Sequence, residues 1–361
     1  MTTARRDIVW DEEAGTYHCT VRCVRRAFLC GFDAYSGENY DHRKQWIRDR
    51  LQVLTRAFGV DALAYAVMSN HSHVVVRTCP DRVKAWTDEE VVKRWFMIYP
   101  PKHGIDKDGH MVYKATDIHI REVLDDPERV DVLRNRMGSL SWFMKSLNEY
   151  IARRANKEDE CKGRFWEGRF KCQRLEGEAG ILACMSYVDL NPVRAGIADS
   201  LEDSEFTSIY DRIMAEKARK RQARLEKEHL AEKQLKQQKE LIQTILDRES
   251  ILLDLDGEES PFSVLDTRRY MELVDWTGRQ LRKDKPGVIS PEIRPLLDSL
   301  DLDAREWVNT VRMYRKRFGL VAGTAERIRE VAAKIGKCWL KGCRSSEAVF
   351  VKAGHGPPVP A

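Results

Sequence analysis

Two histidines one residue apart, in the stretch AYAVMSNHSHVVVRT over residues 64–78, constrain this chain more than any other feature. Short apolar runs on both sides of a Ser-Asn pair predict two strands, over 61–68 and 71–78, joined by a tight turn. Because side chains alternate along a strand, His71 and His73 are expected to point to the same face. Two imidazoles on one strand face can bind a single divalent metal ion.

A second stretch, SYVDLNPVRAGIA over residues 186–198, follows a segment that we expect to be helical from Gly177 to Leu190. On such a helix Tyr187 and Asn191 are four residues apart and share a face. Tyr187 falls off the apolar stripe of this helix, which is formed by Ile181, Leu182 and Met185. A phenol and a carboxamide on one helical surface indicate that something binds there.

A third stretch, GRFWEGRFK over residues 163–171, mixes basic and aromatic residues. Cations neutralise phosphates and aromatic rings stack on bases, so this composition suits single-stranded DNA. The other interpretation is a loop whose aromatic side chains fill the core, and both stay open for the aromatics. The basic residues favour DNA. The residues concerned are Arg164, Phe165, Trp166, Arg169, Phe170, Lys171 and Arg174.

Taken in their order along the chain (64–78, 163–171 and 186–198), the three stretches resemble the single-tyrosine HUH transposases, and among these the REP-associated tyrosine transposases. The resemblance spans about residues 15–210. The family's histidine motif corresponds to His71, Ser72 and His73, and its nucleophile to Tyr187, which NPVRAG follows at 191–196. Ser72 stands where the family has a bulky apolar residue, and we expect its side chain to face the core, away from the metal.

The resemblance implies a metal-dependent endonuclease and strand transferase that acts on single-stranded DNA at hairpins. His71, His73 and Asn191 would bind Mg²⁺ or Mn²⁺, and Tyr187 would attack phosphorus to form a 5′-phosphotyrosine. The alternative is a domesticated protein that binds hairpin DNA or RNA without cutting it, but the presence of Tyr187 favours the enzyme. The expected DNA contacts are Arg164, Trp166, Arg169, Lys171, Arg174 and Arg194.

The order strand, helix, strand, strand, helix, strand predicts an α+β fold, with a ferredoxin-like antiparallel sheet and helices on one face. Residues 1–210 would form this HUH nuclease domain. Within it we expect strands near 16–25 and 169–175, helices over 41–58, 83–99 and 130–155, and a polar insertion over 100–128.

Residues 211–260 are rich in charged side chains and predict a charged helical linker. A solvated helix or linker is the preferred interpretation, and a coiled-coil arm that forms a homodimer is the alternative. Residues 261–347 predict a small all-α domain, and residues 348–361 a disordered tail. Between Pro261 and Arg344 there are 18 Lys and Arg against 11 Asp and Glu, a net charge of +7. A helix-turn-helix that binds duplex DNA and an ordinary charged surface both stay open for this domain.

The chain of 361 residues has a net charge of +5 and nine cysteines, none in a Cys-x-x-Cys pair. The spacing gives little support to a zinc site, and reduced thiols are expected. The N-terminal residues lack the apolar region of a signal peptide, and no apolar run approaches the roughly 20 residues of a membrane span. These features predict a cytoplasmic protein with no membrane partner.

Overall fold

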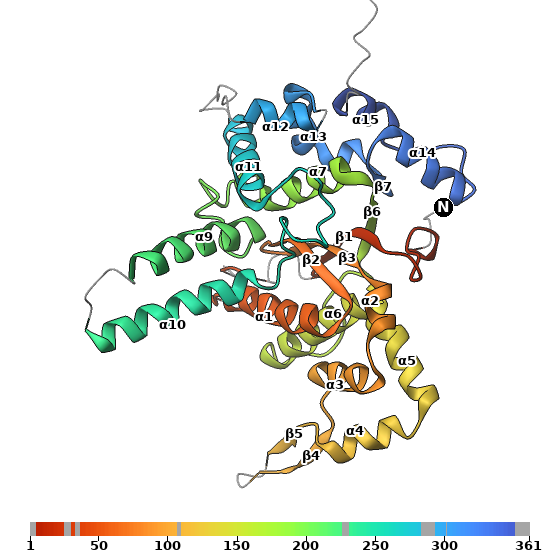
Figure 1. The fold of residues 1–361 in the computed structure, drawn as a ribbon, viewed down its shortest axis with the longest axis vertical. Coiled ribbons are helices and arrows are strands. Elements are labelled where there is room, and N and C mark those ends of the chain that lie inside the picture. The colour runs from red at the N-terminus through yellow and green to blue at the C-terminus, as the bar shows by residue number, and fades with distance from the viewer. Residues whose placement is uncertain are drawn as a thin grey trace, which may run out of the picture.

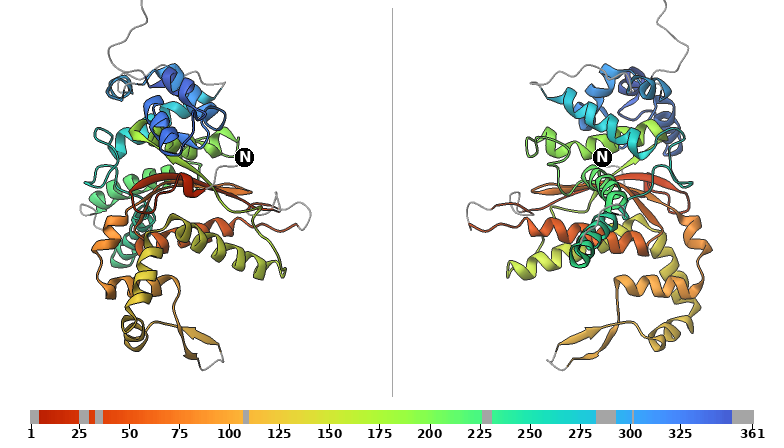
Figure 2. Two further views of the ribbon diagram at one scale, coloured as in Figure 1. Left: turned by 90° about the vertical axis from the view of Figure 1, so that its right-hand side faces the viewer. Right: turned by 60° about the vertical axis from the view of Figure 1, so that its left-hand side comes forward.

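The computed structural model describes residues 5–24, 30–32, 37–106, 110–225, 231–282, 293–300 and 302–350. Within these ranges the chain is a mixed α+β protein in which a five-stranded sheet lies between two layers of helices (Figures 1 and 2). The predicted tail over 348–361 lies outside the described residues from position 351 onward. Among the described helices, none is long and apolar enough to cross a membrane.

The sheet has the strand order β2-β3-β1-β6-β7, and only the β6–β7 pair is parallel. The β2–β3 hairpin closes at a two-residue turn, where the Met68 amide donates to the His71 carbonyl at 2.9 Å. This confirms the hairpin predicted from the sequence. The strands are β1 (Gly15–Arg22), β2 (Val60–Val67), β3 (His71–Thr78), β6 (Lys171–Leu175) and β7 (Val321–Ala322).

One face of the sheet is covered by α1 (His42–Ala57) and α6 (Leu140–Glu158), which pack against each other. The helix expected over 130–155 is broken at Ser139, which is extended between α5 (Pro127–Gly138) and α6. The Met137 carbonyl at the end of α5 accepts a hydrogen bond from the Gly59 amide, outside the helix. Alternate strand residues face this layer, among them Tyr17, Cys19, Val21, Tyr65, Val74 and Val76.

A small subdomain lies between β3 and α6 and has its own apolar cluster. The helix expected over 83–99 is interrupted at Thr87, because Thr87 and Glu90 form a capping box that starts a new helix there. The elements are α2 (Pro80–Ala85), α3 (Asp88–Ile98), the hairpin β4 (Lys102–Ile105) and β5 (Met111–Tyr113), and α4 (Asp117–Leu124).

The charged segment after residue 207 forms two helices, α9 (Ser208–Leu225) and α10 (Glu232–Glu249), where the sequence predicts one helix or a linker. They lie side by side around Ala218, Leu225 and Ile242 (Figure 1). The start of α9 is tied to the sheet, because the Tyr65 hydroxyl donates to the Asp211 carboxylate.

The opposite face of the sheet carries α7 (Gly177–Asp189), and above it lie the C-terminal helices (Figure 2). Helices therefore cover both faces, and the expectation of helices on one face is wrong. The remaining elements are a short 3-10 helix, η1 (Arg5–Asp7), and α8 (Asn191–Arg194), α11 (Thr267–Leu281), α12 (Ile293–Ser299), α13 (Ala304–Arg317), α14 (Ala325–Lys334) and α15 (Cys343–Val349).

The C-terminal segment is not purely helical, because β7 extends the sheet beyond β6. It also packs closely on α7: a Cβ atom on Gly180 would lie 2.6 Å from the Ala322 carbonyl oxygen. One continuous apolar core includes Leu63 of β2, Leu182 of α7 and Trp307 of α13. The segment expected to form a separate helical domain is thus integrated with the sheet and with the helix that carries Tyr187.

Candidate active site

Three imidazoles meet on the face of the sheet that α7 covers. His71 and His73 come from β3, and His18 comes from the neighbouring strand β1, where Thr20 pairs with His73. The His18 Nε2 and His73 Nδ1 atoms lie 2.8 Å apart, and the Thr20 hydroxyl is 3.2 Å from the same Nδ1 atom. The strand prediction for the two β3 histidines is confirmed, and Ser72 is buried on the opposite face of the sheet, as expected.

The hydrogen bonds leave one nitrogen of each β3 histidine available. His71 donates from Nδ1 to the Asn70 Oδ1 atom at 2.6 Å, so its Nε2 atom carries the lone pair. His73 is 1% exposed, and its Nε2 atom is buried without a hydrogen-bond partner in the described structure. A buried nitrogen without a hydrogen-bond partner destabilises the folded protein unless a ligand binds it. Metal-bound histidines bind the metal through one ring nitrogen and form a hydrogen bond through the other, as the Nδ1 atoms of His71 and His73 do here.

The imidazoles lie in a positive field. Burial lowers the pKa of His18 and of His71 to about 4, and the pKa of His73 falls well below its ordinary value for the same reason. The exposed guanidinium groups of Arg22, Arg194 and Arg315 add to these shifts. All three histidines are therefore neutral at pH 7, which is the form that binds metal ions.

Tyr187 stands above this cluster. Its ring centroid is 5.7 Å from that of His73, and the two rings meet edge to face. The side chain is 3% exposed, because the Tyr314 ring stacks on it at 4.8 Å. Arg194 lies over the Tyr187 ring at 4.8 Å and donates to the Arg312 carbonyl at 2.7 Å. Arg194, expected from the sequence as a DNA contact, thus lies at the phenol.

Asn191 has a different local structure from the one expected. Helix α7 ends at Asp189, and Asn191 begins the short helix α8, so Tyr187 and Asn191 do not share one continuous helix. Pro192 explains the break, because proline has no amide hydrogen with which to continue the α7 ladder. The Asn191 Nδ2 atom is buried without a partner, as is His73 Nε2. A flip of the carboxamide would place its oxygen at this position.

Tyr314, on α13, is a site residue that sequence reasoning missed. Its hydroxyl donates to the Gln173 Oε1 atom at 2.8 Å, and the Gln173 amide donates to the Gly319 carbonyl at 2.7 Å. Burial raises the pKa of Tyr314 well above its ordinary value. In the sequence, Tyr314 appears only as one apolar-face residue of an amphipathic helix, and nothing local connects it with Tyr187. His18 is likewise a residue that no local feature of the sequence singles out.

Asp189 fixes the end of α7, two residues after Tyr187. Its buried carboxylate accepts from the Ile209 amide at 3.0 Å and from the hydroxyls of Ser208 and Tyr270. Burial raises the pKa of Asp189 to about 6, and these hydrogen bonds oppose the shift. Hydrogen bonds from α9 and from α11 thereby fix the end of α7, the helix that carries Tyr187.

The predicted DNA contacts divide into two groups. Trp166 is buried and donates from its indole to the Asn148 carbonyl at 2.8 Å, and the neighbouring Phe165 and Phe170 are also buried. Arg174 is buried as well, where it donates to the Tyr17 hydroxyl at 2.9 Å. For these aromatics the core interpretation is right, and Trp166 and Arg174 are unsuited to contact DNA. The exposed members are Arg164, Arg169, Lys171 and Arg194.

The donor set limits which metals fit. Among the described residues, no group of three or more His, Cys, Asp or Glu side chains is arranged to hold a metal ion. The set expected from the sequence, two imidazoles and one carboxamide, would leave coordination positions for phosphate oxygens and water. Such a mixed nitrogen and oxygen set is compatible with Mn²⁺, and with Mg²⁺ when further oxygen ligands complete the shell.

No protein-family model and no curated protein matches this chain. A solved structure of a REP-associated tyrosine transposase bound to a REP hairpin aligns with it at a TM-score of 0.34 and 13% sequence identity. The alignment covers 59% of this chain and 86% of that chain. A TM-score this low does not establish a shared fold, so the similarity by itself assigns no function to the chain.

Proposed function

We propose that this protein is a metal-dependent single-stranded DNA endonuclease and strand transferase that uses Tyr187 as its nucleophile. The observation that carries the proposal is the position of the Tyr187 ring, 5.7 Å from His73, whose Nε2 atom is buried without a partner. The strand order of β1, β2, β3 and β6, with α1 and α6 as crossovers, agrees with the ferredoxin-like arrangement that the resemblance implies.

His71, His73 and Asn191 would hold a Mg²⁺ or Mn²⁺ ion. Such an ion polarises a phosphate oxygen and orients the bond that is cut. His18 would act as a positioning residue. If its Nε2 atom accepts the Nδ1 proton of His73, the lone pair of His73 is on its own Nε2 atom. Thr20 supports the same orientation.

The Tyr187 oxygen would attack phosphorus while the bond from phosphorus to the 3′ oxygen breaks. The products are a 5′-phosphotyrosine and a strand that ends in a 3′-OH; the phenol gives up its proton, and the leaving 3′ oxygen takes one up, so the step balances. Arg194 would stabilise the negative charge that the phenol oxygen carries as it attacks, because its guanidinium lies against the Tyr187 ring. The new ester keeps the energy of the phosphodiester, so a 3′-OH of another strand can reverse the step and complete strand transfer.

The basic residues around the site fit a phosphodiester backbone. Lys171 pairs with Thr20 across β1 and β6, and it therefore lies on the same sheet face as the histidines. With Arg22 and Arg315 it surrounds them with exposed cations. We propose that Arg315 contacts the cleaved strand. It belongs to a basic cluster formed by Arg312, Arg315, Lys316 and Arg317. Contact of this cluster with duplex DNA is a separate proposal, as is a homodimer.

The stacking of Tyr314 on Tyr187 favours the alternative of a protein that binds hairpins without cutting them. Because Tyr187 is 3% exposed, DNA can reach its hydroxyl only after the stack opens. A protein in which the stack never opens would bind hairpins without cutting them, as the domesticated alternative requires.

The deciding experiment incubates the purified protein with end-labelled single-stranded DNA hairpins and Mn²⁺, and resolves the products on denaturing gels. We expect an SDS-stable protein–DNA adduct with the native chain and none with Tyr187→Phe. Tyr314→Phe is the matched variant, since it keeps the stacked ring and removes the other hydroxyl; it should keep the adduct. An adduct in Tyr187→Phe would overturn the assignment of the nucleophile. Hairpin binding without any adduct in the native protein would favour the non-cleaving alternative.

A further inference from the structure

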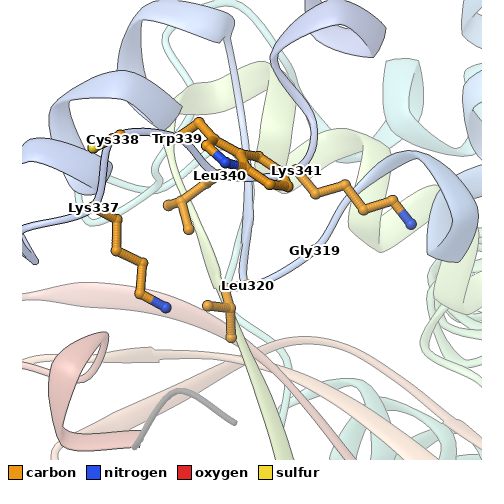
Figure 3. A pocket seen from close by; sticks show the side chains of 7 residues that line it. All are labelled: Gly319, Leu320, Lys337, Cys338, Trp339, Leu340 and Lys341. Atoms are coloured by element: carbon orange, nitrogen blue, oxygen red, sulfur yellow. The ribbon is translucent and has the colours of Figure 1, made fainter. Parts of the chain in front are cut away.

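An exposed tryptophan lines a pocket in the C-terminal segment. Trp339, between α14 and α15, is 74% exposed, which is unusual for a side chain of this size. It lines a pocket of about 510 Å³ together with Gly319, Leu320 and the exposed Lys341 (Figure 3). A flat aromatic surface, a basic side chain and a hollow of this volume thus occur together.

The pocket is joined to Tyr187 by a short chain of contacts. The carbonyl of Gly319, a residue that lines the pocket, accepts from the Gln173 amide at 2.7 Å. Gln173 in turn accepts from the Tyr314 hydroxyl at 2.8 Å, and the Tyr314 ring stacks on Tyr187 at 4.8 Å. One residue that lines the pocket is therefore linked to the proposed nucleophile through Gln173 and Tyr314.

Sheet geometry places the pocket within reach of one DNA strand. Because β7 runs parallel to β6, the residues that precede β7 lie beside the start of β6, where Lys171 is exposed. His73 of β3 is three strands from β7, about 14 Å at roughly 4.8 Å per strand. A strand spaced at about 3.4 Å per nucleotide covers that distance in about four nucleotides.

We propose that Trp339 and Lys341 form a subsite for an unpaired nucleotide that flanks the cleaved phosphate. The base would stack on the indole, and Lys341 would contact the adjoining phosphate. The subsite rests on the proposed function in one respect, namely that the ligand is single-stranded DNA. Stacking on an indole tolerates any base, so the subsite would hold the flank in place without reading its sequence.

The test separates binding from cutting by using Tyr187→Phe protein without divalent metal. Fluorescence anisotropy then measures the affinity for a labelled hairpin that carries unpaired flanks, and for the same hairpin without flanks. We expect Trp339→Ala to weaken binding of the flanked hairpin about 5- to 150-fold, with little effect on the unflanked one. Trp339→Phe should retain most of the affinity, because a ring remains.

Lys341→Ala should lower the salt dependence of binding by about 0.7 in log–log slope, the value for one lost contact to a single strand. Tyr113→Ala is the matched control, since Tyr113 is an exposed aromatic residue on the distant β4–β5 hairpin; it should change neither quantity. A photoreactive 5-iodouracil in the flank should crosslink to Trp339.

Equal affinity of Trp339→Ala and the parent for the flanked hairpin would overturn the subsite, and so would crosslinks that map only elsewhere. Either result would leave the pocket as a surface for another partner, such as a protein. The failure of the proposed function would look different: the native protein would form no adduct, whatever the state of Trp339.

Discussion

Replacing Tyr270 with Phe tests whether the C-terminal helices belong to the same folded unit as the tyrosine helix. Tyr270 lies on α11, and its hydroxyl donates to Asp189 at the end of α7; both residues are fully buried. The substitution keeps the ring and removes one hydrogen bond to a carboxylate. Hydrogen bonds to charged groups contribute about 1.5–3 kcal/mol, so we expect the free energy of unfolding to fall by about 2 kcal/mol near pH 8.

The loss should depend on pH in a defined direction. Burial raises the pKa of Asp189 from 3.8 to about 6 in the folded protein. A carboxyl group with a raised pKa contributes stability that is fully present below its unfolded pKa and is lost as pH rises through the folded value. Removing the Tyr270 donor raises the folded pKa of Asp189 further. As the pH rises, the stability of the variant therefore continues to fall up to a higher pH than that of the native protein. The difference between the two proteins should therefore be larger near pH 8 than near pH 5.

Urea unfolding, followed by tryptophan fluorescence and far-ultraviolet circular dichroism at both pH values, measures this difference. Tyr113→Phe is the control: Tyr113 is 55% exposed, and the change should cost less than about 0.5 kcal/mol. The reasoning would be refuted if Tyr270→Phe were as stable as the native protein at both pH values. Two separate transitions, with only one of them shifted, would also refute it, because they would mean that α11 and α7 do not share a core.

Three further predictions concern the site and the DNA path. Asn191→Ala should weaken Mn²⁺ binding in calorimetric titrations while leaving the unfolding midpoint nearly unchanged; an unaltered metal affinity would make this residue only the start of α8. Replacing Arg164, Arg169 and Lys171 together with Ala should lower the log–log salt slope of single-strand binding by about 0.7 per lost contact, and an unaltered slope would place the DNA elsewhere. A chain that ends after Tyr210 should be insoluble or molten by circular dichroism, since it lacks β7 and half of the α7 core; a folded and active truncation would contradict this integration.

Local patterns in the sequence were sufficient for the β2–β3 hairpin and for the helix that carries Tyr187. The β2–β3 hairpin lies within one residue of its expected bounds, and α7 carries Tyr187 as expected. Thr324 caps α14 through the Arg327 amide, as its position before an apolar stripe predicts. These features follow from side-chain periodicity, capping and turn residues, which act over a few neighbouring positions.

What the sequence could not determine depends on contacts between residues far apart in the chain. His18 meets His73 only because β1 pairs with β3 in one register, and Tyr314 reaches Tyr187 only because α13 packs on α7. Burial of Trp166, whose neighbours suggested a DNA surface, is likewise a result of tertiary packing. Periodicity shows which face of a helix or strand is apolar. Which other element packs against that face depends on how the whole chain fills its core.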